Sequence, residues 1–356
     1  MTPKTHTKLT IGSFDLLKGL AIILMILSHT IGRYNFQQYP WLGAFFELFA
    51  YIGPVSIPAF FVISGIGFRE KSPSAMLKKT FSDTMIPYLL VTVSYALFFP
   101  LVRYPFTGSW SEVYTYAVRY VAAFLLGNIR YGRIVFGHEI YWCTSMWFFL
   151  AFFIALNILN SIVKIKRVSV QVVCVLLLTL IGNYMYANDY SLFCIDRGLR
   201  SVGFCYVGYI VKKHNLYNRL QSNIWTYILT IPVFLLQPRL EQLDQTVFLN
   251  VVLTYFGECI CTLPLIFAGV YLGKFDWVAT SWLKKIGVHS YWIVCIHGFE
   301  TEAFPWYIMC QSMQDRQLLA FGLEALIKTV FIILMCVIIK KISMYRYRKK
   351  VLKARK

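Results

Sequence analysis

Apolar runs recur along the whole chain, and polar residues gather in the short stretches between them. A membrane-spanning helix needs about 20 mostly apolar residues. Stretches that meet or approach this length are 14–33, 44–68, 82–102, 141–163, 168–187, 198–211, 223–238, 247–273, 286–311 and 317–339. The pattern therefore predicts an all-α integral membrane protein with about ten transmembrane helices.

One further apolar stretch, 113–127, is brief and is interrupted by Arg119. If it does not span, both tails and all the lysine-containing loops fall on one side, and the opposite side contains no lysine. If it does span, the second half of the chain inverts and the basic C-terminal tail lies outside, against the positive-inside rule. We therefore expect both termini in the cytoplasm and an amphipathic or re-entrant piece at 113–127 on the outer face.

These spans divide the chain into three parts. Residues 1–13 are expected to be a cytoplasmic tail, 14–339 a single membrane domain, and 340–356 a basic cytoplasmic tail. A polybasic segment next to a span either anchors orientation on anionic lipid or binds a specific partner, and we favour the anchor.

Composition agrees with a membrane protein, since 58% of the residues are hydrophobic and only 14% are charged, against about 25% charged in soluble domains. The net charge of +19 reflects basic clusters that flank the apolar runs, so we expect no nucleic-acid partner. Nine cysteines are present, and none has zinc-finger or redox spacing. We expect no bound metal.

The first span contains three polar side chains that are expensive to place in lipid and by default indicate a functional site. Asp15 and Lys18 are three residues apart and can pair on one helix face. His29 follows Lys18 by eleven residues, almost three turns and about 16 Å along the axis. Lys18 and His29 therefore share a face, with Lys18 near the cytoplasmic boundary. A snorkelling lysine and an unrelated histidine are the alternative.

The second span combines small residues and prolines. Ser64, Gly65 and Gly67 allow close helix approach, and Pro54 and Pro58 are expected to kink the helix. Basic residues follow at the cytoplasmic end: Arg69, Lys71, Lys78 and Lys79. They are either orientation charges or the mouth where a phosphate-bearing ligand docks.

On the expected outer side the basic residues are all arginines, whose planar forks bind carboxylates and phosphates bidentately. They are Arg33, Arg103, Arg119, Arg130, Arg133, Arg197, Arg200, Arg239 and Arg316. Either orientation bias explains the absence of lysine, or these arginines line a path for an anionic acceptor or its lipid-phosphate carrier.

The ninth span contains His297 and Glu300, three residues apart on one face. A carboxylate beside an imidazole can orient it as a base. Glu302 lies on a different face, nearer the surface. A lone buried histidine is usually structural, but this span holds a pair, and the first span holds a second histidine.

Several segments together resemble the membrane acyltransferase-3 family. "DLLKGLAIILMILSH" is similar to its first helix, which has an Asp, an Arg three positions on, and a His eleven positions after the Arg. "FFVISGIGF" resembles its second-helix signature, "MIPYLL" its third-helix proline and "MWFFLAFF" its Trp-Phe-Leu helix. "IGVHSYWIVCIHGFE" resembles its late Gly-x-x-Ser-x-x-Ile-x-x-x-His helix. The segments occur in the family's order.

Two features depart from the family pattern. Lys18 stands where the family usually has Arg, which keeps the charge and loses the bidentate fork. The usual basic pair before the third-helix proline is replaced by Phe81, Asp83 and Thr84, and Lys78 and Lys79 are possible substitutes.

The resemblance implies an acyltransferase that moves an acyl group, which we expect to be acetyl, from cytoplasmic acyl-CoA to a hydroxyl of a cell-surface polysaccharide or lipid-linked sugar. Acyl-CoA is then a co-substrate, and no cofactor is bound. The implied location is the plasma membrane of a bacterium, as a multi-pass protein in contact with membrane lipids. A proton-coupled transporter or flippase, an acetyltransferase acting on sugar amines and a purely structural membrane protein are the alternatives.

The expected roles follow from the shared faces and the resemblance. His29 is the general base, Lys18 supports the donor end of the path, and Asp15 orients Lys18. Ser64, Gly65 and Arg69 shape and charge the cytoplasmic mouth. His297 and Glu300 line the acceptor side.

Overall fold

The structure is a computed structural model that describes residues 11–34, 36, 39, 42, 56–190, 192–240 and 247–354. The first half contains a 3₁₀ turn Ile11–Phe14, α1 Asp15–Ile31, the helix Ser56–Gly67, α3 Pro73–Thr80, a π-helical turn Phe81–Met85, α4 Ile86–Thr107, α5 Trp110–Leu125, β1 Arg133–Val135, β2 His138–Ile140, a 3₁₀ turn Thr144–Met146 and α6 Trp147–Ile162. The second half contains α7 Val168–Ala187, a 3₁₀ turn Leu192–Cys194, α8 Ile195–Lys213, α9 Leu216–Ser222, α10 Ile224–Leu240, α11 Val247–Leu272, α12 Val278–Val288, α13 Ser290–Ala303, α14 Trp306–Ser312, a 3₁₀ turn Gln314–Arg316 and α15 Gln317–Ala354.

The predicted all-α class is confirmed, apart from the short antiparallel hairpin of β1 and β2. Among the described residues, six helices are long and apolar enough to cross a membrane, and two shorter apolar helices accompany them. The six are Gly12–Ile31, Pro73–Thr107, Thr144–Ile162, Val168–Ala187, Val247–Leu272 and Gln314–Lys341. The count of ten and the cytoplasmic location of the termini stay predictions.

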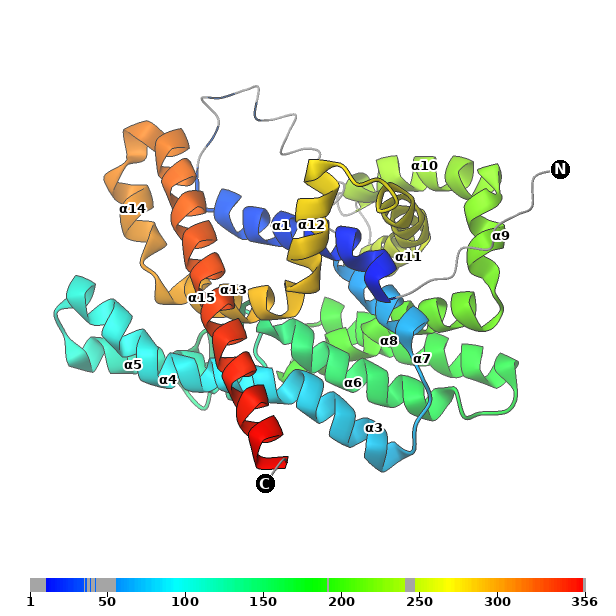
Figure 1. Ribbon diagram of the computed structural model, residues 1–356, viewed down its shortest axis with the longest axis horizontal. Coiled ribbons are helices and arrows are strands. Elements are labelled where there is room, and N and C mark those ends of the chain that lie inside the picture. Colours follow the sequence, from blue (N-terminus) through cyan, green and yellow to red (C-terminus); the bar gives the residue numbers. More distant parts are fainter. Residues whose placement is uncertain are drawn as a thin grey trace.

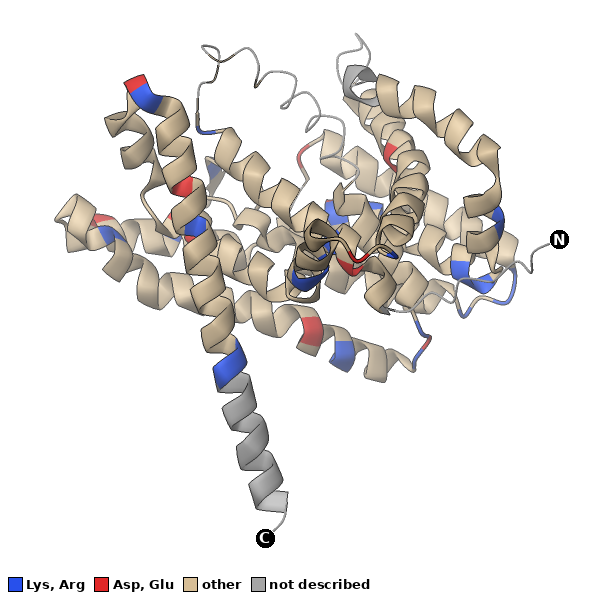
Figure 2. Cartoon of the chain, turned by 45° about the horizontal axis from the view of Figure 1, so that its top comes forward, with Lys and Arg blue, Asp and Glu red and all other residues tan. Residues whose placement is uncertain are grey.

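Lipid-facing surfaces are recognisable on the long helices, because large apolar side chains point away from the bundle. Leu90, Leu97 and Leu101 are each more than half exposed on α4, and Leu326 and Leu334 are on α15. Figure 2 shows how sparse Lys, Arg, Asp and Glu are along these helices. An apolar outer surface of this kind is expected of a helix bundle in lipid.

The third predicted span, 82–102, is part of a longer helical segment. Residues 73–107 form a helical stretch of 35 residues that passes through the π-helical turn Phe81–Met85. Pro87 follows that turn at the start of α4. Because proline has no N–H and crowds the preceding turn, the helix widens before Pro87 rather than ending there, and π turns of this kind often occur at functional sites.

The prediction of one continuous helix over 286–311 is wrong. The segment is divided between α12, α13 and α14, with breaks at His289 and at Phe304–Pro305. Proline disfavours the α conformation of the residue before it, and Phe304 is accordingly extended, with ψ of 140°. The break at His289 lets α12 pack along α1 while α13 turns into the bundle (Figure 1).

Two further predicted stretches are 44–68, which the structure describes only in part, and 113–127, which lies against α4. Residues 44–55 of the predicted span 44–68, and with them Pro54, fall outside the described residues, whereas Pro58 occupies the first turn of the helix Ser56–Gly67, where proline is tolerated. Residues 113–125 of the 113–127 stretch lie within α5, which folds back along α4 (Figure 1) and buries Val113, Ala117 and Tyr120.

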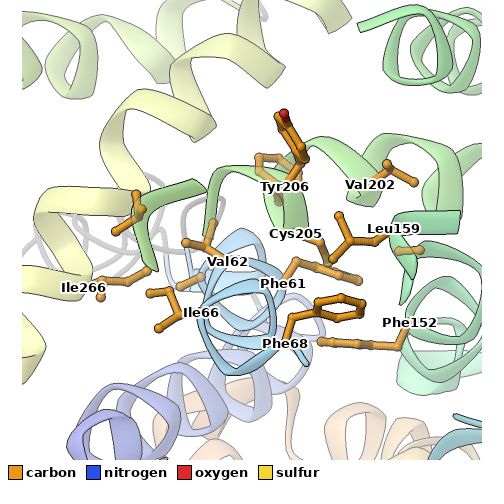
Figure 3. Close-up of a cluster of buried hydrophobic side chains, with 14 of the residues drawn as sticks. Phe61, Val62, Ile66, Phe68, Phe152, Leu159, Val202, Cys205, Tyr206 and Ile266 are labelled. Carbon is orange, nitrogen blue, oxygen red and sulfur yellow. The ribbon is translucent and has the colours of Figure 1, made fainter. Parts of the chain in front are cut away.

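A core of aromatic and aliphatic side chains holds the helix Ser56–Gly67 between α6, α8 and α11 (Figure 3). Phe61 stacks on Phe152 with ring centroids 4.3 Å apart. Close approach to α8 depends on glycine, since a Cβ on Gly65 would lie 1.9 Å from the carbonyl oxygen of Cys205. The small-residue packing predicted for this helix is therefore present at Gly65.

The first helix, α1, runs through the middle of the bundle and contacts α11, α12, α13 and α15 (Figure 1). Its tightest neighbour is α12, where a Cβ on Gly19 would lie 2.0 Å from the carbonyl oxygen of Leu283. These contacts place both ends of α1 among side chains from the last third of the chain.

Candidate active site

His29 and His297 meet in the interior. The Nδ1 atom of His29 lies 3.1 Å from the Nε2 atom of His297, and the two rings are stacked. The Nδ1 atom of His297 lies 2.7 Å from a carboxylate oxygen of Glu300. Three side chains predicted separately from the first and ninth spans therefore form one chain of hydrogen bonds.

The direction of these bonds follows from the acceptors. A carboxylate only accepts, so His297 donates from Nδ1 to Glu300 and its Nε2 carries a lone pair. His29 then donates from Nδ1 to that lone pair, which leaves the Nε2 of His29 as an acceptor. The network thus assigns to His29 the tautomer that a general base needs.

A buried charge cluster lies beside the histidines. Lys328 on α15 is 2.7 Å from Glu324 and 3.7 Å from Glu300, and Arg33, just past the end of α1, is 2.8 Å from Glu324. The two acids are fully buried, and Lys328 is 1% exposed. Two cations and two carboxylates balance one another, as buried charges require.

Hydrogen bonds with neutral side chains complete this cluster. The indole N–H of Trp306 donates to Glu300 over 3.0 Å, and the hydroxyl of Tyr34 donates to Glu324 over 2.6 Å. Lys328 also donates to the hydroxyl of Thr30 over 3.1 Å. Glu300 is therefore held by groups from α13, α14 and α15, and it fixes the orientation of His297.

A cavity of about 550 Å³, here called the Lys18 cavity, opens at the other end of α1. It is lined by polar groups from the π-helical turn and its neighbours, with phenylalanines deeper in: Lys18, Ser64, Lys79, Ser82, Asp83, Thr84, Phe60, Phe148, Phe149, Phe152, Leu156, Ser290, Tyr291 and Val294. The cavity has a charged rim and an apolar interior, which suits a ligand with one anionic end and one apolar arm.

A smaller cavity of about 50 Å³, here called the His29 cavity, lies next to it. Phe60, Phe148 and Val294 line both cavities, so the two cavities adjoin at these side chains. His29 lines the smaller cavity, and His297 is fully buried behind it. Lys18 and His29 thus each line one of two adjoining cavities, and a single path between them stays a prediction.

The other predicted residues are less closely gathered. Asp15 pairs with Lys18 over 2.5 Å, as expected from their spacing. Ser64 lines the Lys18 cavity, whereas Gly65 packs against α8. Arg69 is exposed and lines neither cavity.

Sequence reasoning missed two members of the charge cluster. Glu324 and Lys328 lie four residues apart inside the apolar run 317–339. The rule that singled out His29, that an ionisable group within a span indicates function, applies equally to them. The residues between the cavities, Phe60 and Phe148, carry no such signal, because apolar side chains in an apolar span are indistinguishable by pattern.

The described residues contain no cluster of three or more His, Cys, Asp or Glu side chains suited to a metal ion. The site consists instead of a histidine pair, a buried carboxylate and two adjoining cavities. Such an arrangement can move a proton at the Nε2 atom of His29.

Comparison with known proteins identifies a family. The profile of a family described as an acyltransferase domain matches residues 11–341, nearly the whole chain. No curated protein and no solved structure matches the sequence.

Proposed function

This chain belongs to the membrane acyltransferase-3 family, and on that premise we propose that it is a membrane O-acyltransferase. It moves an acyl group, acetyl in the first instance, from cytoplasmic acyl-CoA to a hydroxyl of a cell-surface polysaccharide or a lipid-linked sugar. The family and the apolar helices support acyltransferase activity in a multi-pass membrane protein. The donor, the acceptor and the bacterial plasma membrane belong to the proposal.

The Lys18 cavity is the proposed donor site. Lys18 and Lys79, which pair with Asp15 and Asp83, lie at its rim and are the proposed partners of the acyl-CoA phosphates, which are too polar for lipid. The phenylalanines deeper in the cavity accept the thin pantetheine arm, whose thioester then reaches the His29 cavity. In the predicted topology the lysine-rich loops lie on the same side as Lys18, and this arrangement supports a cytoplasmic donor.

Chemistry takes place at the Nε2 atom of His29. The acceptor hydroxyl attacks the thioester carbonyl carbon while Nε2 takes its proton. The carbon–sulfur bond then breaks, and the proton passes from His29 to the leaving sulfur. The products are the O-acyl ester and CoA thiol. Glu300 and His297 keep the Nδ1 of His29 engaged as a donor, so the lone pair stays on Nε2.

The observation that carries this proposal is the hydrogen-bonded series Glu300–His297–His29, which ends in a cavity adjoining the Lys18 cavity. A base held by a second group that is itself oriented is typical of activated acyl transfer. Of the two histidines in this series, His29 is the one that lines a cavity, and that cavity adjoins the Lys18 cavity.

The test replaces the base. His29→Ala in the purified, lipid-reconstituted protein should lower acyl transfer from radiolabelled acetyl-CoA to acceptor glycan by roughly 10²–10⁴-fold, the usual contribution of a positioned base. His138→Ala, at an exposed position on the hairpin, is the matched control and should keep full activity.

CoA-dependent thermal stabilisation of both variants shows that each is folded and binds the donor. Wild-type activity in a folded His29→Ala protein contradicts the assignment of the base. Absence of CoA stabilisation in the wild type contradicts the donor site.

A further inference from the structure

A third cavity, here called the arginine cavity, adjoins the His29 cavity on the side away from Lys18. It has a volume of about 210 Å³ and lies among the helix Ser56–Gly67, α6, α7, α8 and α11. Ile57 and Trp147 line both this cavity and the His29 cavity. A ligand in the arginine cavity is therefore next to the base proposed above.

Two guanidinium groups in this cavity are held by aromatic rings. The Arg197 guanidinium lies over Trp147 and Tyr186, 5.0 and 5.1 Å from the ring centroids. The Arg200 guanidinium lies 4.4 Å from the centroid of Tyr186 and 5.6 Å from that of Tyr255. Stacking on aromatic faces positions a guanidinium while leaving its in-plane N–H groups available.

Those N–H groups lack close acceptors within the described part of the chain. Arg197 is 3.5 Å from the nearest carboxylate oxygen, on Asp196, and Arg200 is 3.9 Å from the nearest one, on Glu258. Charge-assisted hydrogen bonds are about 2.7–2.9 Å long, and Arg33 achieves 2.8 Å with Glu324. The Nε of Arg200 is buried and has no hydrogen-bond partner among the described residues.

Burial of unsatisfied donors is unfavourable unless a ligand satisfies them. The side chains of Arg197 and Arg200 are only 23% and 14% exposed, so most of their surface is shielded from water. The cavity lining holds these two cations and one carboxylate, Glu258, while Asp196 lies behind the lining. The lining therefore carries an excess positive charge in a space next to the base.

We propose that the arginine cavity is the acceptor subsite and that Arg197 and Arg200 bind a carboxylate or phosphate group carried by the acceptor sugar. This inference rests on the proposed function, because only an O-acyltransferase needs an acceptor hydroxyl beside His29. Arginine forks pair bidentately with either anion, and the bound anion fixes which hydroxyl of the sugar faces the Nε2 of His29.

The test compares three sugars that differ at one carbon: D-glucose, D-glucuronate and D-glucose 6-phosphate. Thermal unfolding of the purified, full-length protein is measured with each at matched ionic strength. An anionic sugar at saturation should raise the unfolding temperature by roughly 2–4 °C, and neutral glucose should not. A response to glucuronate alone identifies a carboxylate acceptor, and one to glucose 6-phosphate alone a phosphate acceptor.

Three variants locate the binding. Arg200→Gln should abolish the anion-dependent shift, and Arg200→Lys, which keeps the charge without the fork, should reduce it. Arg130→Gln is the matched control: Arg130 is half exposed, pairs with Asp189 and lies outside the cavity, so its shift should equal that of the wild type. Equal shifts with all three sugars, or an Arg200→Gln response equal to that of Arg130→Gln, overturn the inference.

Thermal stabilisation by CoA tests the donor site separately from the acceptor subsite. CoA should stabilise Arg200→Gln as much as the wild type, because the Lys18 cavity is intact, and that result also shows the variant to be folded. CoA stabilisation without any anion-dependent shift overturns the acceptor subsite alone. An anion-dependent shift lost in Arg200→Gln, with no CoA stabilisation of the wild type, overturns the donor site and keeps the anion site.

Discussion

Lys328 places its ammonium nitrogen 2.7 Å from Glu324 and 3.7 Å from Glu300, and that nitrogen lies 5.2 Å from the ring centroid of Trp306. The side chain therefore neutralises two carboxylates on different helices, and one of them, Glu300, orients His297. Because both carboxylates are fully buried, removal of the shared cation leaves negative charge without solvent or a sufficient partner.

Lys328→Met should accordingly lower the free energy of unfolding by roughly 3–5 kcal/mol, the usual cost of breaking a buried ion pair from one side. Lys340→Met, at an exposed position on the same helix, should change it by no more than about 0.5 kcal/mol. Denaturant unfolding of the two variants in the same detergent is the measurement. Equal stabilities would show that Arg33 alone neutralises the cluster.

At the residue scale, the sequence predicted contacts correctly where two polar side chains are spaced to share one helix face. The pairs Asp15–Lys18 and His297–Glu300 are both present as the three-residue spacing predicts. The contact of His29 with His297 could not be predicted from the sequence. The residues are 268 positions apart, and no local rule specifies which faces of two distant helices meet. For the same reason the sequence did not predict the ion pair of Arg33 with Glu324.

At the scale of elements, close packing around the helix Ser56–Gly67 determines where its phenylalanines lie. Gly65 meets the backbone of α8 at Cys205, and Gly208 of α8 meets the backbone at Val62 in return. This reciprocal contact sets the depth at which Phe60 and Phe61 enter the bundle. A side chain at either glycine forces the two helices apart.

Gly65→Ala should therefore destabilise the protein by roughly 1–3 kcal/mol, the usual cost of overpacking. Gly67, two residues along on the same helix, has open space where its Cβ would lie, so Gly67→Ala should be within about 0.5 kcal/mol of the wild type. Thermal unfolding compares the two alanine variants directly. A Gly65→Ala protein as stable as Gly67→Ala would contradict the close contact with α8.

Hydrophobic runs predicted the bounds of long, unbroken helices well and those of interrupted helices poorly. The runs 168–187 and 247–273 correspond closely to α7 and α11. The run 286–311 is equally apolar but is broken into three helices, since apolarity alone does not report the local effect of Pro305 or the packing of α12 on α1. The π-helical turn before Pro87 is likewise invisible to a pattern with a period of 3.6 residues.

At the scale of the whole molecule, three cavities follow one another through the bundle, joined by shared lining residues. The middle one is the smallest of the three, at about 50 Å³. Phe60 and Phe148 bound it, with ring centroids 5.5 Å apart. Space beside His29 therefore suits a short acyl group.

Phe60→Ala should relax this preference. We expect the ratio of kcat/KM for butyryl-CoA to that for acetyl-CoA to rise by at least about tenfold, since each methylene in a pocket is worth about 1–3 kcal/mol. Phe98→Ala, at an exposed position on α4, should leave the ratio unchanged. Competition between the two labelled donors measures it, and an unchanged ratio in Phe60→Ala would show that another wall limits acyl length.

The pairing of Arg33 with Glu324 also has a consequence for biosynthesis. The two residues are 291 positions apart, so a ribosome adding about 5–20 residues per second needs roughly 15–60 s to make the second after the first. For most of that interval the first helix has its base and Arg33 but lacks His297, Glu300 and Lys328. A nascent chain that has not yet reached α13 therefore lacks the oriented histidine pair, and the charge cluster beside the pair is completed only by α15.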